Sequence, residues 1–242
     1  MTRLSNADGY RELELLQKTA QEFQHGVRKQ GDDWKLFELS YFVYAFFSFN
    51  SFYSVNWDES LISSGITSHE YIRGERNPRE GEKIDKFVSF ICGQYPKSKY
   101  LPDEYYNLVK KRWGRLKWEI GSDDHQEKRT LRNAVDKLRD IRPCGDLDED
   151  HAEVFRKDVT SLLSEDPTQR RKDKDVFKEA LCSTLKTVYK VRNNIFHGKK
   201  MVSQIVDDSG QRLRVLLYAT LLLAANELLL EAVAHQCEQT AN

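Results

Sequence analysis

The sequence predicts an all-α fold, and three observations support this prediction. Only five prolines and 12 glycines interrupt the 242 residues. Helix-forming residues dominate, and charged residues are frequent. No segment shows the apolar–polar alternation that is typical of a half-buried β-strand. Because a chain of this length can bury a substantial core, we expect a single domain over residues 1–242.

Two helices are expected before residue 57. The first follows the polar cap at residues 6–8 and ends near Lys29, before Gly31. The second follows the cap at Asp32–Asp33 and ends near Phe52. Aromatic side chains occupy most of the circumference of this second helix, which predicts that it is largely buried in the core.

The middle of the chain is more polar and more often broken. Residues 57–80 contain Gly65, Gly74 and Pro78, so we expect an irregular or partly helical connection. Residues 95–150 are expected to be an insertion between the early and the late helices. Four further helices are expected over about residues 80–94, 102–118, 126–139 and 151–163.

The two strongest helical patterns come last. The first covers residues 173–196, where apolar side chains recur in steps of four and three, and Gly198 supplies a stop. The second covers residues 209–236 and contains the most apolar stretch of the chain, Val215–Ala225. That stretch is much shorter than the ~20 residues of a membrane span, so we expect a core helix.

Composition excludes several classes of protein. Lys+Arg and Asp+Glu are both 38, so a protein that coats nucleic acid through overall charge is not expected. The charges are segregated, with eight acids and two bases in 144–166 but ten bases and three acids in 170–200. The four cysteines form no CxxC pair and have no neighbouring histidine, so we expect no metal site and no cofactor. The first residues lack an apolar signal, and we expect a cytoplasmic protein.

The residues with the most chemical meaning form the 189–200 strip, YKVRNNIFHGKK. On a helix, Asn193 and His197 share a face, whereas Arg192 and His197 are about 140° apart. Histidine can move protons near neutral pH, and an arginine fork matches the oxygens of a phosphate. These groups could support RNA cleavage by the 2′-hydroxyl without a metal. From spacing alone, however, solvated or helix-capping side chains are the favoured interpretation.

Resemblance to a known family changes this interpretation. The strip resembles the Arg-x4-His signature of the HEPN superfamily, in the subfamily form RNN-apolar-FHGGK. Lys199 departs from that form, because a glycine often stands at its position. The aromatic segment Phe46–Tyr53 resembles the W-I-A-F-N-A-L-Y segment of the same proteins, with Phe46 in place of tryptophan. The Leu/Ala-rich helix Arg212–Ala234 is similar as well, and the order of the three segments fits. Matching positions in the strip are Arg192, Asn193, Asn194, Phe196, His197, Gly198 and Lys200.

The resemblance implies a fold and an activity. The fold is an antiparallel bundle of four or five helices, usually a homodimer in which two strips face one cleft. The activity is a metal-independent endoribonuclease that leaves 2′,3′-cyclic phosphate ends, often in a toxin–antitoxin or phage-defence system. Partners would be RNA, a second copy of the chain and an antitoxin or defence protein, with no membrane. The alternative is a non-catalytic member that binds RNA, nucleotides or a protein partner. A weaker alternative is a purely structural helical adaptor.

The expected roles follow residue by residue from the resemblance. His197 would be the general acid and base, Arg192 the phosphate clamp and Asn193 the orienting group. The substrate-binding lysines would be Lys190, Lys199 and Lys200.

Three other features are open to two interpretations. Glu38 could be an acid of the site, although an exposed position is favoured. Lys110–Lys111–Arg112 beside Trp113 could contact RNA, although a solvated helix face with a buried tryptophan is favoured. The basic run 170–172 could pair with the acidic segment 144–166.

Overall fold

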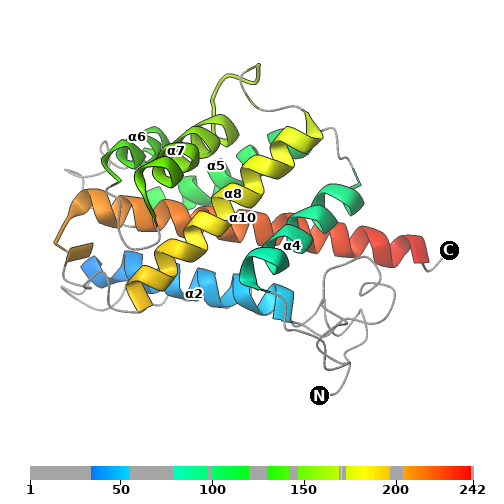
Figure 1. Cartoon of the computed structure of the whole chain (residues 1–242), viewed down its shortest axis with the longest axis horizontal. Helices are drawn as coiled ribbons and strands as arrows, with labels where there is room; N and C mark the ends of the chain where they lie inside the picture. Colours follow the sequence, from blue (N-terminus) through cyan, green and yellow to red (C-terminus); the bar gives the residue numbers. More distant parts are fainter. Residues whose placement is uncertain are drawn as a thin grey trace.

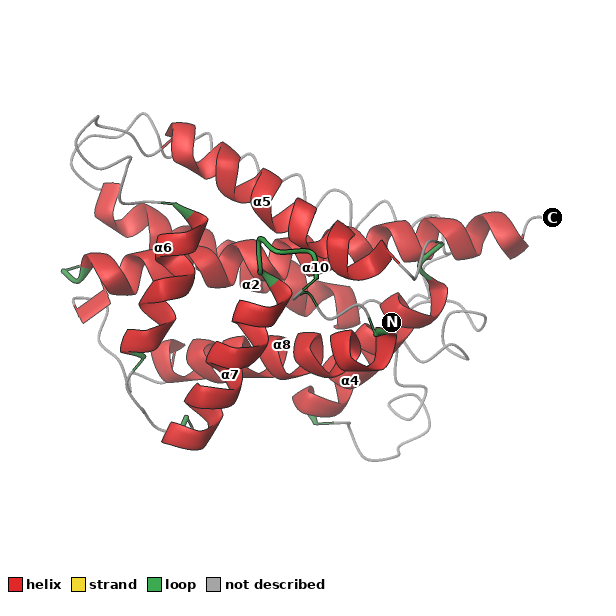
Figure 2. Cartoon of the chain, turned by 90° about the horizontal axis from the view of Figure 1, so that it is seen from above, coloured by secondary structure: helices red, strands yellow, loops and turns green. Residues whose placement is uncertain are grey.

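The computed structural model describes residues 34–54, 79–96, 100–119, 130–141, 147–168, 170, 173–196, 204–205 and 207–240. Within these residues the chain forms helices and no strand, so the all-α prediction is confirmed (Figures 1 and 2). The main elements are α2 (Trp34–Ser54), α4 (Glu80–Gln94), α5 (Leu101–Glu119), α6 (Leu131–Asp136), the 3₁₀ helix η6 (Lys137–Asp140), α7 (Glu149–Leu162), α8 (Lys174–Phe196) and α10 (Ser209–Thr240).

Most of these bounds agree with the sequence prediction to within a few residues. The exception is the helix expected over 126–139. In the structure, the side chain of Thr130 accepts a hydrogen bond from the backbone N–H of Asn133, and α6 therefore begins at residue 131. The last turn then tightens into η6. The helix expected before Lys29 and the connection expected at 57–78 lie outside the described residues.

Helix α10 is the centre of the fold. It packs most extensively on α2 and also contacts α4, α5 and α6. Its apolar segment Val215–Ala225 is buried throughout, as predicted. By length and composition the span Ser209–His235 could cross a membrane, but 94% of its most apolar window is buried inside the protein. The helix therefore has the burial of a core helix.

Helix α2 runs beside α10 in the same direction, as Figure 1 shows. The ring contact of Phe42 with Tyr218 lies in the first half of both helices. Further along both, the side-chain amide of Asn226 donates to the Ser48 hydroxyl. Helix α8, in contrast, is antiparallel to α4, because Cys92 near the end of α4 lies close to Lys174 and Lys178 at the start of α8. The bundle is therefore of mixed direction.

The region that we expected to be an insertion contributes directly to the core. The hydroxyl of Tyr105 on α5 is fully buried and donates to the carbonyl of Leu221. Trp113 is also buried, as expected, but Arg112 is buried too and pairs with Glu227 on α10. The cluster 110–112 is thus only partly a solvated face.

Two expectations about charged residues were wrong in part. Glu38 is 0% exposed, not on the surface, and its carboxylate lies 3.8 Å from the Nε of Arg212. This pairing joins α2 to α10 and explains how a carboxylate is tolerated in the core. In the basic run, Arg170 pairs with Asp103 and donates to two backbone carbonyls of the 144–166 segment, including that of Ser164 at 2.8 Å, whereas Arg171 and Lys172 lie outside the described residues.

Candidate phosphate-binding end of helix α8

The structure describes the first eight residues of the 189–200 strip, which form the last two turns of α8. Arg192, Asn193 and Lys190 are on these turns, and all three side chains are partly buried. His197, Lys199 and Lys200 lie outside the described residues. The structure therefore describes Arg192, which we expected to hold the phosphate, but not His197, which we expected to transfer protons.

The guanidinium of Arg192 is held on two sides. Its central carbon lies 4.9 Å from the centre of the Phe46 ring on α2 and 4.4 Å from the centre of the Phe196 ring on α8. Its Nη1 donates a hydrogen bond of 2.8 Å to the side-chain oxygen of Asn193. Its Nε is buried and has no hydrogen-bond partner among the described residues. An arginine stacked between rings keeps a fixed orientation with donors left over.

Aromatic rings connect this arginine to the core on one side and to the surface on the other. Phe46 is 1% exposed and contacts the ring of Tyr189, one turn before Arg192. Phe47 is 50% exposed, Phe196 is 43% exposed, and their ring centres are 6.4 Å apart. The 189–200 strip and the aromatic segment Phe46–Tyr53, distant in sequence, therefore meet at Arg192.

Lys190 is on the side of α8 that faces the start of α7. Its positive charge contributes weakly to lowering the pKa of the Asp148 carboxyl, whose main causes are hydrogen bonds from the backbone and side chain of His151. Asp148 also caps α7, since its side chain accepts from the backbone N–H of His151. Lys190 thus already has a carboxylate nearby, and its expected role in holding RNA stays a prediction.

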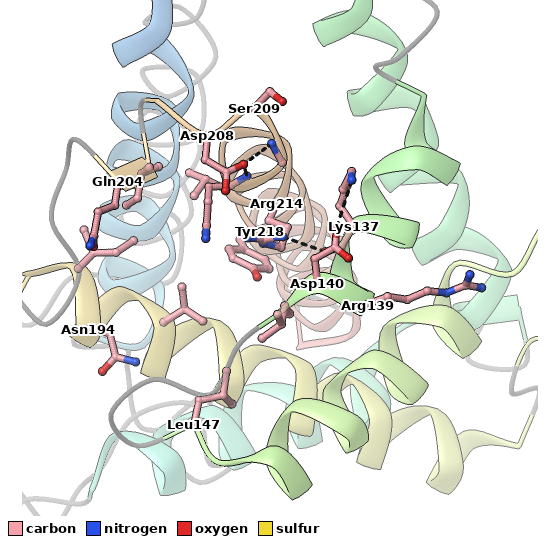
Figure 3. Close-up of a pocket in the computed structure, with 17 residues that line it drawn as sticks. Lys137, Arg139, Asp140, Leu147, Asn194, Gln204, Asp208, Ser209, Arg214 and Tyr218 are labelled. Carbon is pink, nitrogen blue, oxygen red and sulfur yellow. Dashed lines mark hydrogen bonds and ion pairs between the residues drawn. The ribbon is translucent and has the colours of Figure 1, made fainter.

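A neighbouring side of the same two turns borders a cavity of about 950 Å³, shown in Figure 3. The cavity lies between the end of α8, η6 and the beginning of α10. Asn194, which is 4% exposed, lines it together with Val191 and Ile195. The end of α8 therefore has two different faces, one carrying Arg192 against aromatic rings and one facing a cavity.

Sequence reasoning missed two residues of this cavity, Arg214 and Tyr218 on α10. A signal was present, because Arg212 and Arg214 are the only charged residues between Gly210 and Glu227. A cation in such an apolar helix requires either a partner or a solvated space. Burial raises the pKa of Tyr218 to about 12, and the positive charge of Arg214 opposes that rise.

Chemically, the Arg192 face offers an oriented guanidinium with exposed rings beside it, which suits a phosphate joined to a stackable base. Among the described residues no group of three or more His, Cys, Asp or Glu side chains could hold a metal ion. No known protein family, curated protein or solved structure matches the chain.

Proposed function

We propose that the chain is a metal-independent endoribonuclease of the HEPN type, which cleaves RNA and leaves 2′,3′-cyclic phosphate ends. The observation that carries this proposal is the contact between Arg192 of the strip and Phe46 of the aromatic segment. The sequence resemblance pairs these two segments, and the fold places them together. The proposed setting, a cytoplasmic toxin or phage-defence system with an antitoxin or defence partner, rests on the resemblance alone.

In the proposed reaction, the 2′-oxygen of RNA forms a bond to phosphorus while the bond to the 5′-oxygen breaks. His197 takes the proton of the 2′-hydroxyl, and an acid returns a proton to the leaving 5′-oxygen. Arg192 donates to the phosphate oxygens, where negative charge grows in the transition state. Asn193 orients the imidazole, and Lys190, Lys199 and Lys200 hold the RNA backbone.

A homodimer belongs to this proposal. On a regular helix, Arg192 and His197 are about 140° apart, so one strip does not easily direct both at one phosphate. Two copies of the strip in one cleft would provide both groups and two histidines, one as base and one as acid. The exposed rings of Phe47 and Phe196 beside Arg192 offer apolar surface for such an interface.

The decisive experiment is cleavage of a mixed RNA pool by the purified protein in EDTA, with chemical analysis of the product ends. His197→Ala should abolish cleavage without changing the fold. His151→Ala is the matched control, because it removes a half-exposed histidine from α7. Parent-level cleavage by His197→Ala, or products with 3′-hydroxyl ends, would reject the assignment.

One observation favours the non-catalytic alternative. The side-chain oxygen of Asn193 already accepts a hydrogen bond from Arg192, so only its NH₂ group remains to orient a histidine. Such an arrangement suits binding of a phosphate as well as cleavage. Absence of cleavage, together with RNA binding that Arg192→Gln weakens, would establish the binding module instead.

A further inference from the structure

Four arginines are buried in the described residues, and one of them differs from the other three. A buried charge is costly unless it has a partner. Three have a carboxylate partner: Arg112 with Glu227, Arg170 with Asp103, and Arg212 with Glu38. Arg214, at 5% exposed, forms no ion pair with any described residue.

Arg214 instead faces the cavity of about 950 Å³. Its Nη1 donates to the backbone carbonyl of Lys137 at 3.0 Å, which fixes the guanidinium at the cavity wall. Tyr218, one turn further along α10, lines the same cavity. Figure 3 shows the two side chains next to each other in the middle of the cavity view.

Among the described residues, the two carboxylates that line the cavity already have other partners. Asp208 caps α10, because its Oδ1 accepts from the backbone N–H groups of Gly210 at 2.8 Å and Gln211 at 3.1 Å. Asp140 on η6 lies 3.1 Å from the Nζ of Lys137. Neither forms an ion pair with Arg214, so the guanidinium keeps its positive charge available to a ligand.

The rest of the lining is mixed, with six aliphatic side chains beside polar and charged ones that include Lys137 and Arg139. The volume of the cavity, about 950 Å³, is within the ~300–1,000 Å³ range of small-molecule sites. Such sites combine apolar walls with a few polar groups that fix the orientation of the ligand. The apolar lining residues are Ile141, Leu147, Val191, Ile195, Ile205 and Val215.

We propose that this cavity binds a small organic molecule with an apolar body and one oxyanion head group, a carboxylate or a phosphate. The guanidinium of Arg214 and the hydroxyl of Tyr218 donate to the head group, and the aliphatic walls cover the body. The amide of Asn194 provides a further polar contact from α8. This binding site is distinct from the proposed nuclease site, because it uses the side of α8 that carries Val191, Asn194 and Ile195 and is not lined by Arg192, and it does not depend on RNA cleavage.

The test uses the full-length protein and three probes that share a phenyl body: phenylacetate, phenyl phosphate and the neutral phenylacetamide. Binding is measured by saturation-transfer and chemical-shift titration of each probe. Phenylacetate, phenyl phosphate or both should bind saturably at one site, and phenylacetamide should bind at least about tenfold more weakly, since it lacks the charge-assisted hydrogen bond. The stronger of the two anions identifies the head group.

Variants locate the site. Arg214→Gln should weaken binding of the preferred anion about tenfold or more, and Tyr218→Phe by a smaller factor. Tyr105→Phe is the matched control, because it removes a buried hydroxyl from a residue that does not line the cavity, and it should leave binding unchanged. If Arg214→Gln fails to fold, Tyr218→Phe and the amide probe decide. No saturable binding by the parent, equal binding of the amide, or unchanged binding in both folded variants would overturn the proposal.

Discussion

The two ends of α8 have different roles in the molecule. In its first part the side chains of Phe177, Leu181, Thr184 and Val188 are all fully buried. In its last two turns only Asn194 is buried, and Phe196 is nearly half exposed. The same helix thus begins as a core element and ends with partly exposed side chains. The comparison teaches that periodic apolar spacing identifies the first kind of region, whereas the second kind is visible only through particular polar residues.

The largest expected effect is a difference in the free energy of unfolding between substitutions at the two ends of α8. Phe177→Ala should lower the free energy of unfolding by about 3–5 kcal/mol, because it leaves a cavity in the core. Phe196→Ala removes a ring of the same size at a position that is 43% exposed, and its cost should be below about 1 kcal/mol. Urea unfolding of both variants measures the difference. Similar losses for the two would contradict the division of α8 into a core part and a surface part.

The next largest effect is a difference in RNA cleavage between substitutions at the two ends of α8. Arg192→Lys keeps the positive charge but removes the planar fork and its stacking against Phe46. RNA cleavage should fall by about 10²-fold, the size found when one transition-state donor is lost. Because the side chain is at the surface end of α8, the unfolding midpoint should change little.

Lys178→Ala is the control for this prediction, since it removes a cation from the first part of the same helix. Its cleavage rate should equal that of the parent. Equal losses in the two variants would mean that the general charge of α8, not the position of Arg192, supports the reaction.

Sequence alone was sufficient for the helices with clear ends. Glu80–Gln94 was predicted to the residue, because polar residues precede it and a proline follows its last turn. The start of α6 was missed, because the cap that sets it is one threonine within a polar run. Glu38 was misplaced, since the arginine that makes its burial tolerable lies far away in the sequence. No local pattern contains that information.

The candidate site shows the same limit. Spacing and resemblance identified Arg192 and Asn193, and the structure adds that the two side chains bond to each other. The cavity on the neighbouring face was not predicted, because its wall comes from several segments, distant in sequence, that meet only in the fold. The isolated cation Arg214 was the one local indication of it. Its meaning depends on the lack of an ion pair with the nearby carboxylates of Asp140 and Asp208, and only the three-dimensional arrangement of the described residues shows this.

The dependence of stability on pH tests the packing of α4 against the first part of α8. Cys92 lies against this end, and burial raises the pKa of its thiol to about 11 from the ordinary value of 9.0. The unfolded chain therefore releases this proton at lower pH than the folded protein does. Stability from this group is complete below pH 9 and should be lost as the pH rises from 9 towards 11.

Urea unfolding at pH 8, 9 and 10 measures this loss. In Cys92→Ala the decline above pH 9 should be shallower than in the parent, although other buried groups with raised pKa values, Cys182 and Tyr218 among them, still contribute. Superimposable pH profiles for parent and variant would show that the Cys92 thiol is not the source.

The smallest effect has the opposite sign to most core substitutions. The hydroxyl of Thr184 is buried in the core part of α8 and has no hydrogen-bond partner among the described residues. Thr184→Val removes this unsatisfied group at nearly constant shape and should stabilise the fold by about 1 kcal/mol.

Thr187, one turn nearer the surface end, donates its hydroxyl to the Ser183 carbonyl at 2.9 Å. Thr187→Val should therefore be neutral or slightly destabilising, and two thermal melts compare them. If both variants shifted the melting temperature in the same direction by the same amount, the difference in hydrogen bonding between these two threonines would have no energetic consequence, and the boundary within α8 would have to be drawn from apolar burial alone.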